Sequence, residues 1–189
     1  MLYSKNISSV FILILLFVLF PSCKKNTPFE FRKIVFEYEY INYAWGYNHS
    51  GWFIDTTGLV YYHKSVNEHE IWNSADNSGY LSEGALQQNF NLSDTVIYTL
   101  NKTEVKGKAA LNRFVTTDNF SEILHPMADA GIGTLYCYVW DKEVLKYRRL
   151  FLAESGDLRQ ANNDPDAILL THWLIDKGNN QIKYFFWSE

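Results

Sequence analysis

The stretch FEFRKIVFEYEYINY, residues 29–43, decides the expected fold. Aromatic side chains alternate with glutamates in its second half, in the order Phe36, Glu37, Tyr38, Glu39 and Tyr40. A period of two residues is that of a β-strand, because successive side chains of a strand point to opposite faces. The pattern predicts one long strand with an apolar side and a water-facing side. The disturbed parity near Lys33 predicts a bulge.

A hairpin is expected after this strand. Two apolar runs, residues 52–55 and 59–63, are joined by Asp55-Thr56-Thr57-Gly58. Gly58 can supply the positive φ that such a short loop needs. Residues 44–51 are rich in turn formers and are expected to connect the long strand to the hairpin.

Capping residues mark three helices farther along the chain. The expected helices are 82–89, 101–114 and 164–177, opened by Ser82, Asn101 and Asp164. Pro165 favours the start of the last helix, which is expected to turn Leu170, Trp173 and Leu174 inward. A fourth, short helix is expected at 119–124, before Pro126. Residues 67–78 are polar and predict a loop.

The remaining patterns indicate strands and complete the fold prediction. Strands are expected at 95–100, 134–140, 147–153 and 181–187. Gly131 and Gly133 mark a turn, where Asp129 is expected to bond the loop amides. Aromatic residues make up 17% of the chain and suit half-buried sheet surfaces. We expect a single α+β domain at 29–189, with an antiparallel, aromatic-rich sheet packed against a few helices.

The N-terminus has the pattern of an export signal. Lys5 precedes an apolar run, residues 10–20, which is about half the roughly 20 residues that a membrane-spanning helix needs. The ending Leu19-Phe20-Pro21-Ser22-Cys23 resembles a bacterial lipobox, in which the cysteine is acylated before cleavage. Residues 1–22 are therefore predicted as a lipoprotein signal peptide and 23–28 as a tether. An ordinary cleaved signal and an uncleaved anchor are the alternatives.

This signal predicts the location and one partner, the membrane. The protein is expected on the extracytoplasmic side of the bacterial envelope, attached through acyl chains on Cys23. The whole chain has a net charge of −4 and no long basic run, which argues against nucleic acid as a partner. With Cys23 acylated, Cys137 is the remaining thiol. Its place in an expected strand predicts a buried, unreactive side chain.

No motif in the sequence predicts catalysis, a metal or a cofactor. His63, Glu68, His69 and Glu70 form the densest group of ligand types, but they lack the spacing of a metal site. A solvated charge cluster in a loop is the simpler interpretation. Gly-rich phosphate loops and nucleophile-elbow serine motifs are absent from the sequence. An enzyme is therefore the least favoured interpretation, with no catalytic residue to name.

Three aromatic residues are the best candidates for a binding site. Trp45, Tyr47 and Trp52 surround a Gly-rich turn, with His49 between them. Exposed on a turn, they could stack on the sugar rings of a glycan or anchor a protein partner. The other interpretation, which we favour, is that they cover the open end of the sheet.

Two groups of motifs, taken in their order along the chain, suggest a family resemblance. The first is Gly51-Trp52-Phe53-Ile54-Asp55 with Gly58-Leu59-Val60-Tyr61, and the second runs from Ala128-Asp129-Ala130-Gly131 through Tyr138-Val139-Trp140-Asp141 to Gly156-Asp157 and Trp173-Leu174. This order resembles a group of small, uncharacterised bacterial secreted lipoproteins over residues 36–178. The resemblance implies no activity.

Three functional classes are consistent with these observations. The first is a lipid-anchored binding or envelope-associated structural module. The second is an inhibitor or immunity-type protein, which should present an exposed acidic patch to a protein partner. The third is an envelope enzyme, which would need a deep pocket with converging polar groups.

Overall fold

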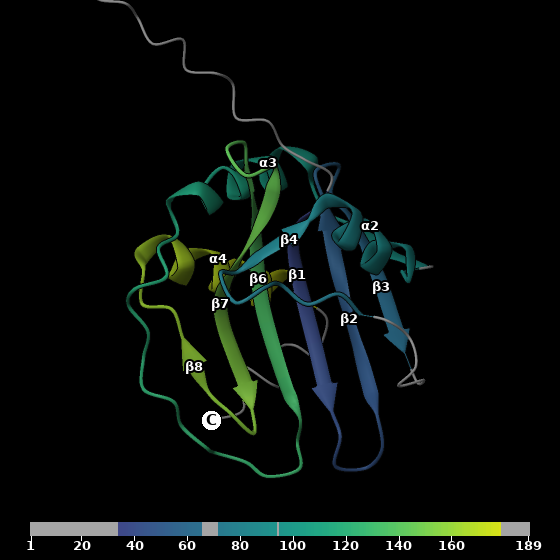
Figure 1. Cartoon of the computed structure of the whole chain (residues 1–189), viewed down its shortest axis with the longest axis vertical. Helices are drawn as coiled ribbons and strands as arrows, with labels where there is room; N and C mark the ends of the chain where they lie inside the picture. The colour runs from purple at the N-terminus through teal and green to yellow at the C-terminus, as the bar shows by residue number, and fades with distance from the viewer. Residues whose placement is uncertain (1–33, 66–71, 94, 179–189) are drawn as a thin grey trace, which may run out of the picture.

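The computed structural model describes residues 34–65, 72–93 and 95–178. Eight strands form one antiparallel sheet in the order β4-β7-β6-β1-β2-β3-β5, with β8 paired to β7 (Figure 1). The strands are β1 (Ile34–Asn42), β2 (Asn48–Asp55), β3 (Leu59–Ser65), β4 (Tyr80–Ser82), β5 (Thr95–Thr99), β6 (Ile132–Asp141), β7 (Lys146–Gly156) and β8 (Gln160–Ala161). The predicted α+β class is confirmed.

The helices begin where the capping residues predicted. They are α2 (Glu83–Asn91), α3 (Lys102–Ala109), the short 3-10 helix η1 (Asn112–Phe114) and α4 (Pro165–Lys177). The side chains of Ser82, Asn101 and Asp164 each accept a hydrogen bond from a backbone N–H in the first helical turn. The helix predicted for 101–114 is shorter, because α3 stops at Ala109.

Helix α4 covers one face of the sheet and forms the main core there. Leu170, Trp173 and Leu174 are buried, as predicted, and the Trp173 ring lies 5.2 Å from the ring of Phe36 on β1. Cys137 is fully buried in the same cluster. Helix α2 lies over the other face, where it packs against residues of β2 and β6. The sheet is therefore a central layer with a helix on each side (Figure 1).

The predicted hairpin and bulge are both present. β2 and β3 pair around a turn in which Gly58 has a φ of 92°. The register of β1 against β2 shifts between Ile34 and Phe36, close to the bulge expected near Lys33. Strand β2 begins at Asn48, so half of the expected connection 44–51 is already paired. The predictions for the signal peptide 1–22, Cys23, the tether 23–28, Glu68 to Glu70 and the strand 181–187 lie outside the described residues.

Two local predictions are wrong. Residues 119–124 are extended instead of helical, because their backbone pairs with residues 159–163, as in the 2.8 Å bond from Ser121 N–H to the Ala161 carbonyl. Asp157, and not Asp129, accepts the hydrogen bonds of the 129–131 loop: its carboxylate bonds the N–H groups of Ala130 and Gly131 at 2.7 and 3.2 Å. Both errors arise from contacts with residues 157–163, which are remote in sequence.

In the described residues, no helix is long and apolar enough to cross a membrane.

Candidate functional site

The glutamate side of β1 is buried, which corrects the prediction of a water-facing side. Glu37 is 0% exposed and Glu39 is 7% exposed. Strand β1 lies in the middle of the sheet, between β2 and β6, and its glutamates point to the face opposite α4. The segment 72–79 crosses this face (Figure 1). Two buried carboxylates require compensation, and a cation from β7 provides it.

Arg149 binds both glutamates. Its Nε donates to Glu37 Oε2 at 2.8 Å, and Nη2 donates to Glu39 Oε2 at 2.7 Å. Tyr138 also donates to Glu37 Oε2, at 2.5 Å. The guanidinium carbon lies 3.5 Å from the centre of the Tyr136 ring, within the range of a cation–π interaction. One arginine thus joins neighbouring positions of β1 to two tyrosines of β6.

A chain of imidazole and phenol groups extends this network along β2. His49 Nε2 lies 3.0 Å from Glu39 Oε1, and His49 Nδ1 lies 3.2 Å from the Tyr47 hydroxyl. The ring of Trp72 lies 4.3 Å from that of His49 and 4.6 Å from that of His63. The Trp72 indole therefore covers both histidines.

Burial and the charge of Arg149 together shift the pKa values in the network. Burial raises the pKa of Glu37, and the nearby Arg149 offsets this effect only in part. For Glu39, burial acts in the same direction but is outweighed by Arg149 and the His49 hydrogen bond, which lower the pKa to about 2. Burial lowers the pKa of His63 to about 3, so this imidazole is neutral near pH 7. Glu39 is therefore ionised at neutral pH and held in place by two partners.

A cavity of about 540 Å³ lies beside this network. It occupies the end of the sheet where β1 stops and where β6 begins. Its lining residues are Glu39, Ile41, Asn42, Tyr43, Ala44, Asp129, Gly131, Ile132, Thr134, Tyr136, Glu154 and Asp157. This set contains four carboxylates, two phenol rings and no lysine, arginine or histidine. The cavity therefore offers acceptors to a ligand that donates hydrogen bonds.

Glu154 is a lining carboxylate that belongs to β7. It lies opposite Thr134 on β6 and is half-buried, and burial raises its pKa. Two of the other three carboxylates have fixed roles: Glu39 bonds Arg149, and Asp157 bonds the 129–131 loop, whereas Asp129 is exposed at the rim. Glu154 is thus the side chain best placed to meet a ligand.

The rim of the cavity is bonded to β1. The Tyr40 hydroxyl donates to the Ala130 carbonyl at 2.9 Å, and Asn42 Nδ2 donates to the Asp129 carbonyl at 3.2 Å. Gly131 has a φ of 76°, and a Cβ there would lie 2.7 Å from the Ile41 carbonyl oxygen. Two hydrogen bonds and a close backbone approach therefore tie the 129–131 loop to β1.

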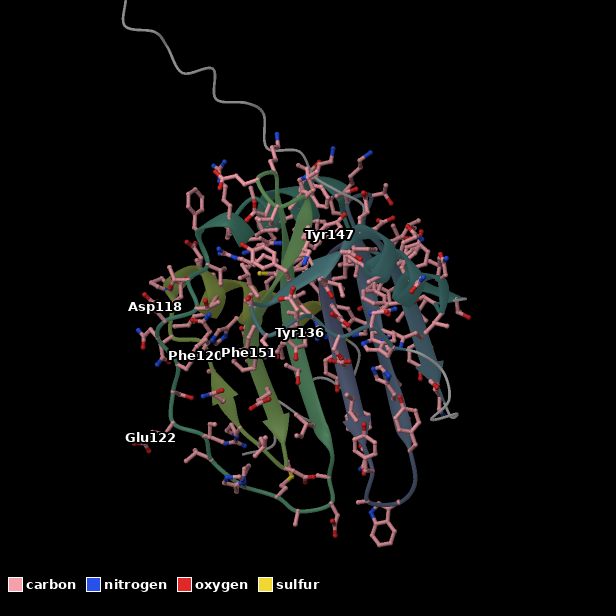
Figure 2. The ribbon with its side chains drawn as sticks, in the orientation of Figure 1. Asp118, Phe120, Glu122, Tyr136, Tyr147 and Phe151 are labelled. Carbon is pink, nitrogen blue, oxygen red and sulfur yellow. The ribbon has the colours of Figure 1, made fainter. Side chains whose placement is uncertain are left out.

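Aromatic rings continue from the cavity across β7. The Phe151 ring lies 6.3 Å from that of Tyr136 and 5.7 Å from that of Phe120, in edge-on contacts. Figure 2 shows these three side chains side by side over the sheet, whereas Asp118 and Glu122 point away from it. The floor next to the cavity is thus largely aromatic.

The structure separates the three aromatic residues that the sequence singled out. Trp52 is 2% exposed and packs on the α4 face, with its ring 5.8 Å from that of Tyr38. Trp45 is 86% exposed in the β1–β2 turn, and Tyr47 bonds His49 on the other face. A shared exposed cluster is therefore wrong. Trp52 lies in the core in the middle of β2 and not over the open end of the sheet, whereas Trp45 is exposed near the cavity rim.

The sequence analysis missed the residues that build the site. Arg149 reaches glutamates that precede it by 112 and 110 positions. One signal was available in the sequence: two glutamates lie in one expected strand and Arg149 lies in another. If the faces of these strands that carry the charges were buried, each charge would need a partner of opposite sign. In the described part of the chain, no group of three or more His, Cys, Asp or Glu side chains could hold a metal.

The geometry favours binding over proton transfer. Glu37 is enclosed and cannot meet a ligand, while both oxygens of Glu39 have partners. The network therefore fixes the charge and position of the cavity wall. Comparison with protein families, curated protein sequences and solved structures finds no match to this chain.

Proposed function

We propose that this protein is a lipid-anchored binding module of the bacterial cell envelope and that its ligand occupies the 540 Å³ cavity at the end of the sheet. The observation that carries the proposal is the buried network of Glu37, Glu39 and Arg149 next to that cavity. Buried ion pairs contribute little net stability compared with apolar residues of similar volume. A role in shaping the wall of a ligand-binding cavity would explain why this protein has a buried ion-pair network.

The cavity has the size and composition of a small-ligand site. Its volume falls within the roughly 300–1,000 Å³ typical of such sites. The Glu154 carboxylate can accept hydrogen bonds from a ligand, the Glu39 carboxylate adds negative charge to the wall, and the Tyr136 ring offers an apolar surface. A sugar or an amine matches this combination, because both carry several donors and an apolar face.

The lipid anchor is supported by the sequence alone. Cys23 follows a short apolar leader, and multiple acyl chains on one cysteine bind a membrane stably. Replacing Cys23 with Ala should abolish labelling by a radioactive fatty acid and leave the chain unprocessed or released. Unchanged lipid labelling would refute this part of the proposal.

Ligand binding can be tested with a chemically graded panel. Amino sugars, neutral sugars, short polyamines and, as a control, dicarboxylic acids would be titrated against the purified protein, with the unfolding temperature as readout. We expect stabilisation by donors and none by dicarboxylates. The Glu154→Gln variant should weaken this stabilisation, whereas Glu122→Gln, at an exposed position outside the cavity lining, should not.

Equal shifts for wild-type protein and Glu154→Gln would place any binding elsewhere. No shift with any donor at millimolar concentration would refute a small-ligand site.

A protein partner is the second candidate, and one observation favours it. Tyr43 and Trp45 are 72% and 86% exposed at the cavity rim or beside it, and Asp129 adds an exposed acid. Exposed aromatics next to acids suit a basic protein surface. Crosslinking in intact cells through a photoreactive residue at position 45 would test this. A specific protein adduct would favour the inhibitor class. Loss of that adduct on mutating Tyr43 would place the partner's binding surface at the cavity rim.

A further inference from the structure

The end of the sheet opposite the cavity has a different surface. The described chain enters β1 at Ile34, and Phe36 pairs with Cys137 of the antiparallel strand β6. β6 then continues to Asp141, so the β6–β7 turn, residues 142–145, projects past the start of β1. Helix α3 is at this same end, whereas the β1–β2 turn lies at the other (Figure 1). We call the end that carries α3 and the β6–β7 turn the entry end.

The turn at the entry end exposes two aliphatic side chains. Val144 is 50% exposed and Leu145 is 67% exposed. Leu145 has a φ of 54°, in the left-handed region that L-residues other than Asn and Asp rarely adopt. Glycine or asparagine would relax the backbone here. Neither burial nor backbone geometry therefore explains a leucine at this position.

Exposed cations outnumber exposed acids around this apolar tip. In residues 101–114 and 141–146, the exposed charged side chains are Lys102, Lys106, Arg113, Lys142 and Glu143. Two further exposed acids lie beside Lys146: Asp76, which forms an ion pair with it, and Glu83, which follows its strand partner Ser82. Figure 2 shows nitrogen-tipped side chains projecting from this end. Phe114 is 52% exposed, and the Arg113 guanidinium lies 4.5 Å from its ring centre. The cavity end instead carries carboxylates, so the two ends of the domain differ in charge.

We propose that the entry end rests on the anionic bilayer that holds the Cys23 anchor, with Val144 and Leu145 in the headgroup region and the cavity turned away from the membrane. This inference rests on the proposed lipid anchor. Aliphatic side chains flanked by lysine and arginine match an interface whose surface is anionic and whose interior is apolar.

The length of chain before β1 identifies the bilayer as the occupant. Residues 23–33 can span at most about 40 Å when fully extended. Because this segment joins the domain at the entry end, that end stays near the membrane at an effective concentration of order millimolar. Weak contacts are then enough to orient the domain.

Depth-dependent quenching tests this orientation. The lipidated full chain would carry Leu145→Cys, labelled with an environment-sensitive fluorophore, in vesicles of phosphatidylethanolamine and phosphatidylglycerol containing a shallow nitroxide lipid. The matched control is Trp45→Cys, at the exposed turn of the opposite end. The native Cys137 is fully buried, and burial raises its pKa, so it should not be labelled.

We expect several-fold stronger quenching at position 145 than at position 45, and a decrease when phosphatidylglycerol is replaced by phosphatidylcholine. In Val144→Cys protein, adding Leu145→Gly should reduce quenching without lowering the unfolding temperature, because glycine accepts the positive φ. Equal quenching at positions 145 and 45 in vesicle-bound protein would overturn the proposed orientation. The exposed turn at 144–145 would then be better explained as a contact surface for a protein partner. Failure of the protein to float with vesicles would overturn the anchor as well.

Discussion

Replacing Arg149 with Met tests the buried network that shapes the cavity. Methionine keeps much of the volume but removes the cation that bonds Glu37 and Glu39 at 2.8 and 2.7 Å. Breaking a buried ion pair by removing one partner typically costs about 3–5 kcal/mol, because the remaining charge is uncompensated. We expect the free energy of unfolding at pH 7 to fall by that amount.

The lowered pKa of Glu39 gives a figure of the same order, to which His49 contributes together with Arg149. Its value of about 2, against 4.5 for an unperturbed glutamate, corresponds to about 3 kcal/mol of stability at neutral pH. Since the folded-state pKa lies below the unfolded one, this contribution is complete above about pH 4.5 and is lost as the pH falls towards 2. The pKa of Glu37 is raised in the folded protein, so Glu37 ionises less readily there than in the unfolded chain. Its contribution to the free energy of unfolding therefore becomes less favourable as the pH rises.

The assay is equilibrium urea unfolding of wild-type protein and Arg149→Met between pH 7 and pH 2. The stability difference should be largest near neutrality and should shrink below pH 4.5, as Glu39 becomes protonated. Arg113→Met is the matched control, because Arg113 is exposed, and should change stability by no more than about 0.5 kcal/mol. A loss of less than about 1 kcal/mol for Arg149→Met at pH 7, or a loss independent of pH, would refute the reasoning.

Three further predictions concern other parts of the fold. Trp173→Ala should lower the free energy of unfolding by about 3–5 kcal/mol, because this side chain is 7% exposed. Trp45→Ala, at an exposed position, should lower it by at most about 0.5 kcal/mol. Urea unfolding compares the two variants, and a wild-type-like curve for Trp173→Ala would refute the docking of α4. Cys137 should react with a maleimide only in unfolded protein, since burial raises its pKa; rapid labelling of the native form, followed by mass spectrometry, would contradict this. A chelator should leave the unfolding temperature unchanged, and a large drop would restore the metal hypothesis at His63 and His69.

Much of the fold could be predicted from the sequence because its signals are local. Ser82, Asn101 and Asp164 cap helices through backbone groups within three residues of themselves. The Asp55–Gly58 turn needs only its own backbone geometry. The alternation in residues 36–40 predicted a strand and its two faces. Short-range hydrogen bonds and side-chain periodicity do not depend on distant partners, so these patterns were informative.

The environment of each strand face was decided by the tertiary structure. The glutamates of β1 were predicted to meet water, and the sequence could not show that Arg149, 112 positions after Glu37, would compensate for their burial. The segment 119–124 likewise lost its expected helix to backbone pairing with residues 159–163. Trp52 was expected near Trp45, yet the alternation of side chains along β2 places it in the core. Strand order and pairing bring such residues together, and they depend on contacts over the whole chain.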